Sequence, residues 1–436
     1  MLLQDILNHI HSLMPVQDAA RAACVSRQFV RSWRGYSNLK LNALTLGLID
    51  KNPKKEKSIL LTNNGVKVKT LDLDLSDCNN ISPSDLDRWL RITVKSGIKE
   101  LTLGLCLFMS KKYSFPCLVL SDEAAASSIR SLRLTGCVFH PTTTLGCSSN
   151  LKRLDLCSVH ITENGLQHVL SKSFALEWLQ IFLCSNIISL RIPSMLQQLK
   201  HLKHYYGTLV DFSVGDPLQL KDVKMSSFLT SGTLSYARAK LPSIARNVES
   251  LTLCSFNENV NAPMPPSKLL HLKNLEITLL GTVAAFFPCY DLFSMVSFLD
   301  ASPALESFVL RASRYPYISL GAIYVLHLVK TGALRHGPVV GDYDEAYLRR
   351  KPGCRHERLR QVMITGFCSA KSLVELVIYI LESTPSLKRL TLDTTQGPDR
   401  KCGSGGCDQI QVSKAVEAAS RYIAGKVPPT VAFQVL

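Results

Sequence analysis

Apolar and polar residues alternate in short phrases that recur along most of the 436-residue chain. Alternation with a period of two predicts a β-strand with one buried face. A further apolar residue often stands three positions before the phrase, as Leu151 and Leu272 do. The clearest phrases are Leu71-Asp-Leu73, Leu101-Thr-Leu103, Leu132-Arg-Leu134, Leu154-Asp-Leu156, Leu179-Gln-Ile181, Leu251-Thr-Leu253, Leu275-Glu-Ile277 and Leu390-Thr-Leu392.

These phrases return at intervals that predict a stack of repeats. The strands centre on residues 71, 101, 132, 154 and 179, and again on 251, 275, 308 and 390. Most neighbours lie 22 to 33 residues apart, which is the period of leucine-rich repeats, whose units bury their apolar faces only against one another. Weaker units are expected at Leu202–Tyr205, Leu220–Met225 and Val362–Ile364.

Several connections between the strands carry helix signals. Ser82 and Thr162 stand at N-cap positions before apolar residues with helical spacing. Ser372 followed by Glu375 matches a capping box. Strand, turn, helix and turn then make one coil. We therefore predict an α/β leucine-rich-repeat solenoid, with parallel strands on one face and helices or irregular turns on the other.

Residues 1–45 follow a helical pattern instead. Pro15 ends a first helix, and Asp18 is expected to cap a second. A module of this size has more apolar surface than it can bury alone, so it needs a partner or a larger neighbour. The polar and basic residues 46–66 are expected to form a linker. The apolar positions of the two helices are Ile6, Leu7, Ile10 and Leu13, and then Ala22, Val25, Phe29 and Trp33.

Charge and cysteine content narrow the range of partners. The 50 lysines and arginines exceed the 34 acidic residues by 16, which fits either an anionic partner or a solvated surface. The charges are spread out, so the solvated surface is favoured and no nucleic-acid partner is expected. The 14 cysteines are scattered and no signal peptide is recognised, which favours reduced thiols in the nucleus or cytoplasm. The apolar uncharged run 277–290 is too short to cross a membrane.

Two cysteine–histidine pairs raise the question of a zinc site. Zinc needs four nitrogen or sulfur ligands at one point, and Cys137 with His140 and Cys157 with His160 have suitable spacing. However, Cys106, Cys137 and Cys184 each stand three residues after the last leucine of a phrase, a position that leucine-rich repeats reserve for a turn residue. No catalytic motif is present, so we expect no metal, no cofactor and no enzymatic activity. Function is expected at exposed positions between the leucines.

The order of these parts resembles that of a known protein family. Residues 2–41 resemble an F-box, in the opening Leu2-Leu3-Gln-Asp-Ile6-Leu7 and in its later apolar residues. The usual opening is Leu-Pro-Glu-Asp-Ile-Leu, and Leu3 stands here in place of the proline. Residues 356–376, Leu387 to Asp393 and the closing residues 422–431 resemble the FBD-type end of plant F-box/leucine-rich-repeat proteins.

The resemblance implies a substrate-recognition subunit of a Skp–cullin–F-box ubiquitin ligase. It implies an F-box at 1–45, leucine-rich repeats at 67–355, FBD-like terminal repeats at 356–395 and a tail at 396–436. The F-box would bind a Skp-family adaptor and, through it, a cullin, while the repeats bind an unknown target protein. The alternative is a repeat scaffold with a degenerate F-box outside any ligase. The expected adaptor-binding residues are Leu2, Ile6, Leu7, Ile10, Leu13 and Pro15.

Overall fold

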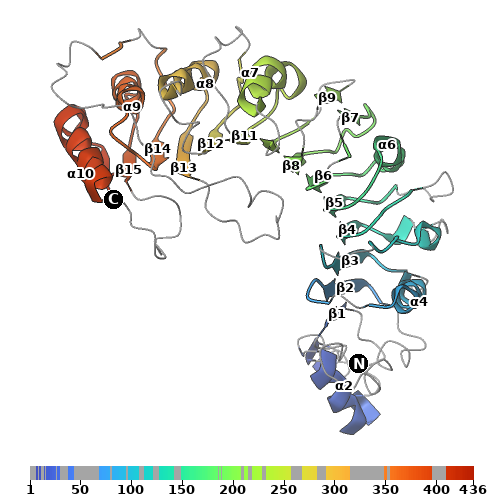
Figure 1. Cartoon of the computed structure of the whole chain (residues 1–436). Helices are drawn as coiled ribbons and strands as arrows, with labels where there is room; N and C mark the ends of the chain where they lie inside the picture. Colours follow the sequence, from blue (N-terminus) through green and yellow to red (C-terminus); the bar gives the residue numbers. More distant parts are fainter. Residues whose placement is uncertain are drawn as a thin grey trace. The chain divides into compact units, whose positions relative to one another are not determined.

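Parallel strands, one from each repeat, form the framework of the chain (Figure 1). The chain divides into two units, residues 1–199 with 210–215 and residues 200–209 with 216–436. The computed structural model describes residues 6–7, 9–10, 14, 16–25, 27–29, 38–43, 68–78, 81–94, 97–107, 112–120, 127–141, 149–184, 186–187, 189–207, 211–214, 219–227, 232–256, 268–281, 291–314, 348–350, 354–394 and 409–436.

The first unit is a parallel sheet whose strands follow the order of the chain. Its strands are β1 (Asn38–Asn42), β2 (Thr70–Leu75), β3 (Glu100–Leu105), β4 (Ser131–Thr135), β5 (Arg153–Cys157) and β6 (Trp178–Phe182). A separate pair joins β7 (Ser189–Ile192) to β9 (Asp211–Val214). The helical elements are α2 (Val16–Val25), α4 (Pro83–Val94), η1 (Cys117–Leu120) and α6 (Glu163–Ser171).

The second unit repeats this plan. Its parallel strands are β8 (His201–Gly207), β10 (Asp222–Ser227), β11 (Ser250–Phe256), β12 (Asn274–Gly281), β13 (Ser307–Arg314), β14 (Gln361–Thr365), β15 (Arg389–Asp393) and β16 (Ala432–Val435). Its helical elements are α7 (Thr233–Ile244), η2 (Leu292–Met295), α8 (Val296–Ala301), α9 (Lys371–Ser383), α10 (Gln409–Ala418), η4 (Ala419–Ile423) and η5 (Ala424–Lys426).

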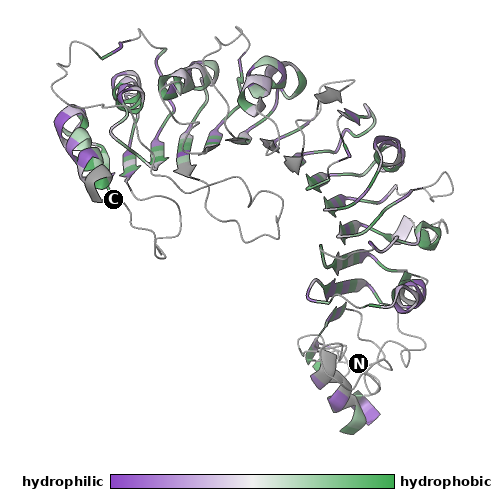
Figure 2. Ribbon diagram, in the orientation of Figure 1, coloured by the Kyte–Doolittle hydropathy of each residue, from purple (hydrophilic) through white to green (hydrophobic). Residues whose placement is uncertain are grey.

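The leucine phrases form the core of both units, as predicted. Leu71 lies opposite Leu101, and Leu101 opposite Leu132, so equivalent leucines make a continuous column. These leucines are at most 3% exposed. Each buried leucine contributes about 1.5–3 kcal/mol through the apolar area that it removes from water. Green and purple alternate along the strands in Figure 2 because each strand has one apolar face and one polar face.

The three weaker repeats are also confirmed, because β8, β10 and β14 cover them. The sheet extends further at both ends than the sequence indicated. Leu39, which was assigned to the helical module, lies in β1 and is 1% exposed. At the other end β16 pairs with β15, so a segment expected to be a tail adds a strand. The predicted linker at 46–66 lies outside the described residues.

Helix starts were predicted with mixed success. Thr162 caps α6 by accepting a hydrogen bond from the backbone N–H of Gly165 at 3.1 Å, and α4 begins at Pro83, directly after Ser82. The capping box at Ser372 is wrong, because the N-cap of α9 is Ala370, two residues earlier, and it makes no side-chain cap hydrogen bond. Asp18 is not an N-cap either, since it lies within the first turn of α2.

The described helices also bear on the expected absence of a membrane segment. None of them combines the length and the apolar character that a bilayer crossing requires.

Candidate binding surface

One face of each sheet points away from the leucine core, and we call it the open face. In the first unit the register aligns its residues in rows across β2 to β6. These rows are the positions between the leucines where function was expected, and most of them are partly exposed. The first row is Thr70, Glu100, Ser131, Arg153 and Trp178. The second row is Asp72, Thr102, Arg133, Asp155 and Gln180.

A cluster around Asp155 is the most structured part of this face. The Asp155 side chain is only 7% exposed, and its Oδ2 lies 3.2 Å from Nε of Arg133 and 3.5 Å from Nη2 of Arg153. The Arg153 guanidinium in turn stacks over the Trp178 ring, 4.3 Å from its centroid. Two cations and stacking hold these side chains in place. We call these four residues the Asp155 cluster.

The composition of this cluster indicates what it can do. Tryptophan and arginine are the residue types that most often dominate the energy of protein interfaces, because they bring a large contact area with polar ends. The cluster is ordered before any partner arrives, which lowers the entropy cost of binding. These properties suit the Asp155 cluster to binding another molecule rather than to catalysis. The sequence indicated the positions between the leucines in general but did not single out these four residues.

The cysteines predicted to occupy turns lie where the repeat phase placed them. Cys137 and Cys184 are buried, and the Cys184 thiol donates to the carbonyl of Phe182 at 3.5 Å. Burial raises the pKa of each of these two thiols to about 12, whereas zinc binds the thiolate. His140 is exposed, and the ring of His160 is paired with Asn186. Among the described residues there is no group of three side chains suited to hold a metal.

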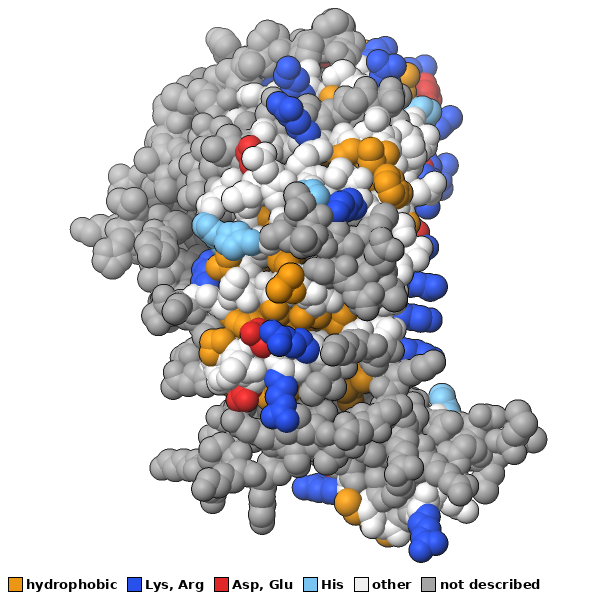
Figure 3. Space-filling view, turned by 90° about the vertical axis from the view of Figure 1, so that its right-hand side faces the viewer, with side chains coloured by type: hydrophobic (Ala, Val, Ile, Leu, Met, Phe, Trp, Pro, Cys, Tyr) orange, Lys and Arg blue, Asp and Glu red, His pale blue; other side chains and the backbone are white. Residues whose placement is uncertain are grey.

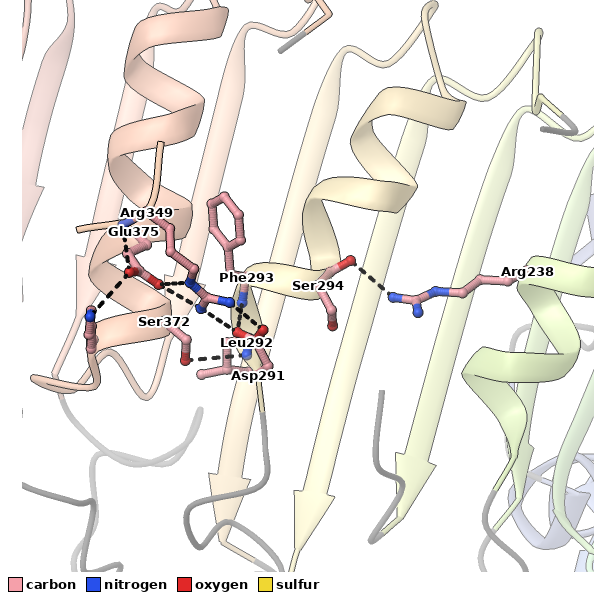
Figure 4. Close-up of polar contacts among 9 residues, drawn as sticks. Arg238, Asp291, Leu292, Phe293, Ser294, Arg349, Ser372 and Glu375 are labelled. Atoms are coloured by element: carbon pink, nitrogen blue, oxygen red, sulfur yellow. Dashed lines mark hydrogen bonds and ion pairs between the residues drawn. The ribbon is translucent and has the colours of Figure 1, made fainter. Parts of the chain in front are cut away.

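The second unit holds an ion-pair cluster that the sequence did not reveal (Figure 4). Nη1 and Nη2 of Arg349 donate to the two carboxylate oxygens of Asp291 at 2.6 and 2.7 Å. Arg349 also donates through Nε to Oε2 of Glu375 at 2.8 Å and lies over the Phe293 ring. Hydrogen bonds from Arg349 to Asp291 and Glu375 raise the pKa of its guanidinium. We call Arg349, Asp291 and Glu375 the Arg349 clip.

The Arg349 clip also explains why the capping box failed. Glu375 faces Arg349 rather than the start of α9, and Ser372 accepts a hydrogen bond from the backbone N–H of Leu292. Ser372 therefore joins α9 to η2 directly, and Glu375 does so through Arg349 and Asp291. A pattern of residues three positions apart cannot report a partner from a distant repeat.

The expected adaptor-binding residues are described only in part. Ile6 is 52% and Ile10 is 43% exposed, while Leu7 is partly buried. Leu2, Leu13 and Pro15 lie outside the described residues. Val25, an apolar position of the second predicted helix, is 86% exposed. The N-terminal segment thus presents three large apolar side chains that its described neighbours do not cover.

Comparison with known proteins identifies the family. The family model described as "At1g61320/AtMIF1, LRR domain" matches residues 59–206 and 202–436. The chain belongs to this leucine-rich-repeat family. The match covers the second unit and the first unit from residue 59, but not the first 58 residues, so the F-box resemblance stays a prediction.

Two further comparisons add little to this result. No curated protein matches the chain. Among solved structures, the leucine-rich-repeat protein LIC12759 of Leptospira interrogans is 16% identical, with a TM-score of 0.33. That alignment covers 59% of this chain and 58% of the Leptospira protein.

Proposed function

We propose that this chain is the target-recognition subunit of a Skp–cullin–F-box ubiquitin ligase. In this proposal it performs no bond chemistry itself. The open face holds a target protein and the N-terminal helices hold a Skp-family adaptor, so that ubiquitin transfer is promoted by a raised effective concentration. The family membership supports the first half, since stacked repeats form extended surfaces for protein partners.

Binding of an adaptor by the N-terminal helices is supported by the exposure of Ile6, Ile10 and Val25. Large apolar side chains that a small helical segment leaves exposed indicate a docking surface, because their exposure to water is unfavourable. A helical adaptor would cover them, as an amphipathic helix is covered in a groove. The F-box resemblance of residues 2–41 is the reason for proposing a Skp-family protein as that adaptor.

A pull-down with a purified Skp-family adaptor tests the proposal. Ile6→Asp combined with Ile10→Asp should abolish capture, because two carboxylates would have to be buried without partners. Leu118→Asp is the matched control, since Leu118 is 76% exposed but belongs to the repeats, and it should leave capture unchanged. Equal capture of all three proteins would refute the proposed adaptor surface.

A repeat scaffold outside any ligase is the second candidate function. It is favoured by the family match, which begins only at residue 59, and by the unusual opening with Leu3. Co-purification from cells separates the two. A cullin that co-purifies with the wild-type chain and not with the Ile6 and Ile10 double variant supports the ligase. Partners retained without any cullin support the scaffold.

A further inference from the structure

A single file of basic residues runs along the edge of the first unit where its strands begin. Lys69, Lys99, Arg130 and Lys152 each stand directly before one of the strands β2 to β5, and all four are exposed. The Lys99 N–H donates to the Lys69 carbonyl at 2.7 Å, and the same bond joins Arg130 to Lys99 and Lys152 to Arg130. These bonds keep the four residues in line. We call them the basic ribbon.

The charges of the basic ribbon are close together and largely uncompensated. Neighbouring strands lie about 4.8 Å apart, well inside the screening length of about 8 Å at physiological salt. Within the described part of the chain, no ion pair joins Lys69, Lys99 or Arg130 to a carboxylate. Lys152 is paired at 2.7 Å with Glu177, which occupies the next position and ends the ribbon. Figure 3 shows lysine and arginine side chains projecting along one edge of the surface.

The second unit shows that the repeat does not require this pattern. There the equivalent positions before β10, β11 and β12 are Lys221, Glu249 and Lys273. Glu249 lies 3.3 Å from the Lys221 ammonium and 2.8 Å from the Lys273 ammonium. Hydrogen bonds from the two lysines lower the pKa of the Glu249 carboxyl. An acidic residue is thus accepted at this position. In the described strands of the second unit the cations at this position come at most two in succession, as Arg360 and Lys388 do, whereas the first unit has four in succession.

We propose that the basic ribbon binds an extended acidic segment of a partner protein. An extended chain advances about 3.3 Å per residue, so carboxylates on one side of it stand about 6.6 Å apart. The long, exposed lysine and arginine side chains of the ribbon can adjust from the strand separation of about 4.8 Å to that spacing. The first-row neighbours Glu100 and Arg153 lie on the open face beside the ribbon, so a segment bound there would reach that face. The inference deepens the proposed function, because it names the chemistry of the target.

The shape of the ribbon favours an acidic protein segment over nucleic acid. Duplex DNA carries phosphates on two strands and is usually held by a broad basic surface, whereas the ribbon is one residue wide. Proteins that bind single strands combine a basic groove with aromatic platforms on which the bases stack. The first-row residues directly after the four ribbon residues include no aromatic side chain, and Trp178 follows Glu177, where the ribbon has ended.

Binding of a labelled peptide to the full chain tests the inference. The probe is a fluorescent peptide of about twelve residues that alternates glutamate and serine, long enough to span the ribbon at about 3.3 Å per residue. Fluorescence anisotropy should show binding that weakens as salt rises. Lys69→Glu, Lys99→Glu and Arg130→Glu together should weaken it by at least about tenfold. Glu177→Gln should strengthen it, because Lys152 would then be released to the peptide.

A matched control separates the ribbon from the overall charge. Lys240→Glu, Arg246→Glu and Lys414→Glu change the net charge equally, but at exposed positions of the second unit that do not stand directly before a strand. This control should bind the peptide like the wild type, and both variants should melt at the wild-type temperature by circular dichroism. Equal weakening by the control, no binding at low salt, or tighter ribbon-dependent binding of a single-stranded oligonucleotide would each overturn the inference. Capture of a Skp-family adaptor should be unchanged in all variants, which separates this result from failure of the proposed function.

Discussion

Arg349 and Glu375 are joined through both the backbone and the side chain of the arginine. The Arg349 N–H donates to Oε1 at 2.8 Å, while Nε and Nη2 donate to Oε2 at 2.8 and 2.6 Å. The Glu375 side chain is fully buried. Burying a carboxylate costs free energy unless both of its oxygens accept hydrogen bonds. The hydrogen bonds from Arg349 therefore make it possible for α9 to carry a buried acidic residue at position 375.

The first prediction follows from this pair. Arg349→Met should lower the free energy of unfolding by about 2–4 kcal/mol, because it leaves the Glu375 and Asp291 carboxylates without their main cation. Adding Glu375→Leu should recover a large part of the loss, since a buried pair can be replaced by apolar side chains. Chemical denaturation of the two single variants and the double variant measures this coupling.

Lys371→Met is the control for the Arg349 clip. The Lys371 ammonium lies 4.0 Å from Glu375 and its side chain is 48% exposed, so its removal should cost less than about 0.5 kcal/mol. If Arg349→Met with Glu375→Leu is no more stable than Arg349→Met alone, the loss of stability does not come from an unpaired buried carboxylate, and the prediction is wrong.

The Arg349 clip marks the limit of what the sequence predicts here. The strands β2 to β6 could be predicted because the alternation of apolar and polar residues within each leucine phrase indicates both a strand and its buried face. Glu375 finds its partner 26 residues earlier, in a connection that does not repeat. For the Asp155 cluster, the sequence predicted only that functional residues would lie between the leucines. It could not predict which of them contact one another, because those contacts depend on the register between repeats whose loops differ in length.

The second prediction concerns His204, which occupies a core position in β8 opposite Met225. It is 2% exposed, and burial lowers its pKa to about 4. The unfolded chain therefore binds more protons between about pH 6.5 and pH 4, so stability is complete above that window and is lost as the pH falls through it. The slope is up to about 1.4 kcal/mol per pH unit.

His204→Leu should remove this part of the acid sensitivity, as measured by urea denaturation at several pH values. The variant should keep some slope, because burial also lowers the pKa of His356. His140→Gln is the matched control at an exposed histidine and should keep the whole slope. Identical pH profiles for His204→Leu and the wild type would contradict the assignment.

The third prediction tests the open face as the target-binding surface. Trp178→Ala should weaken target binding by about 30-fold or more, the effect expected when an interface residue of this type is removed. Gln180→Ala changes a neighbouring open-face residue of the same strand and should have little effect. Proximity labelling in cells, with each variant expressed at equal level, compares the captured proteins. If Trp178→Ala captures the same set of proteins as the wild type, the target-binding surface does not include Trp178.

The fourth prediction compares two glycines with left-handed backbones. Gly366 follows β14 at a φ of +75°, and a Cβ atom there would lie only 1.8 Å from the Ala312 carbonyl oxygen. Gly97 has a φ of +81°, but a Cβ atom there would meet nothing within 4 Å. Alanine at either position carries the left-handed strain of about 1–2 kcal/mol, and only at Gly366 must the backbone of β13 also move.

Gly366→Ala should therefore lower the free energy of unfolding by at least about 3 kcal/mol, and Gly97→Ala by about 1 kcal/mol. Urea denaturation of both variants under the same conditions makes the comparison. Gly366 belongs to the stretch that resembles the FBD-type end, so the result also gives a physical reason for a glycine in that motif. Equal losses in the two variants would mean that β13 and β14 do not approach as closely as described.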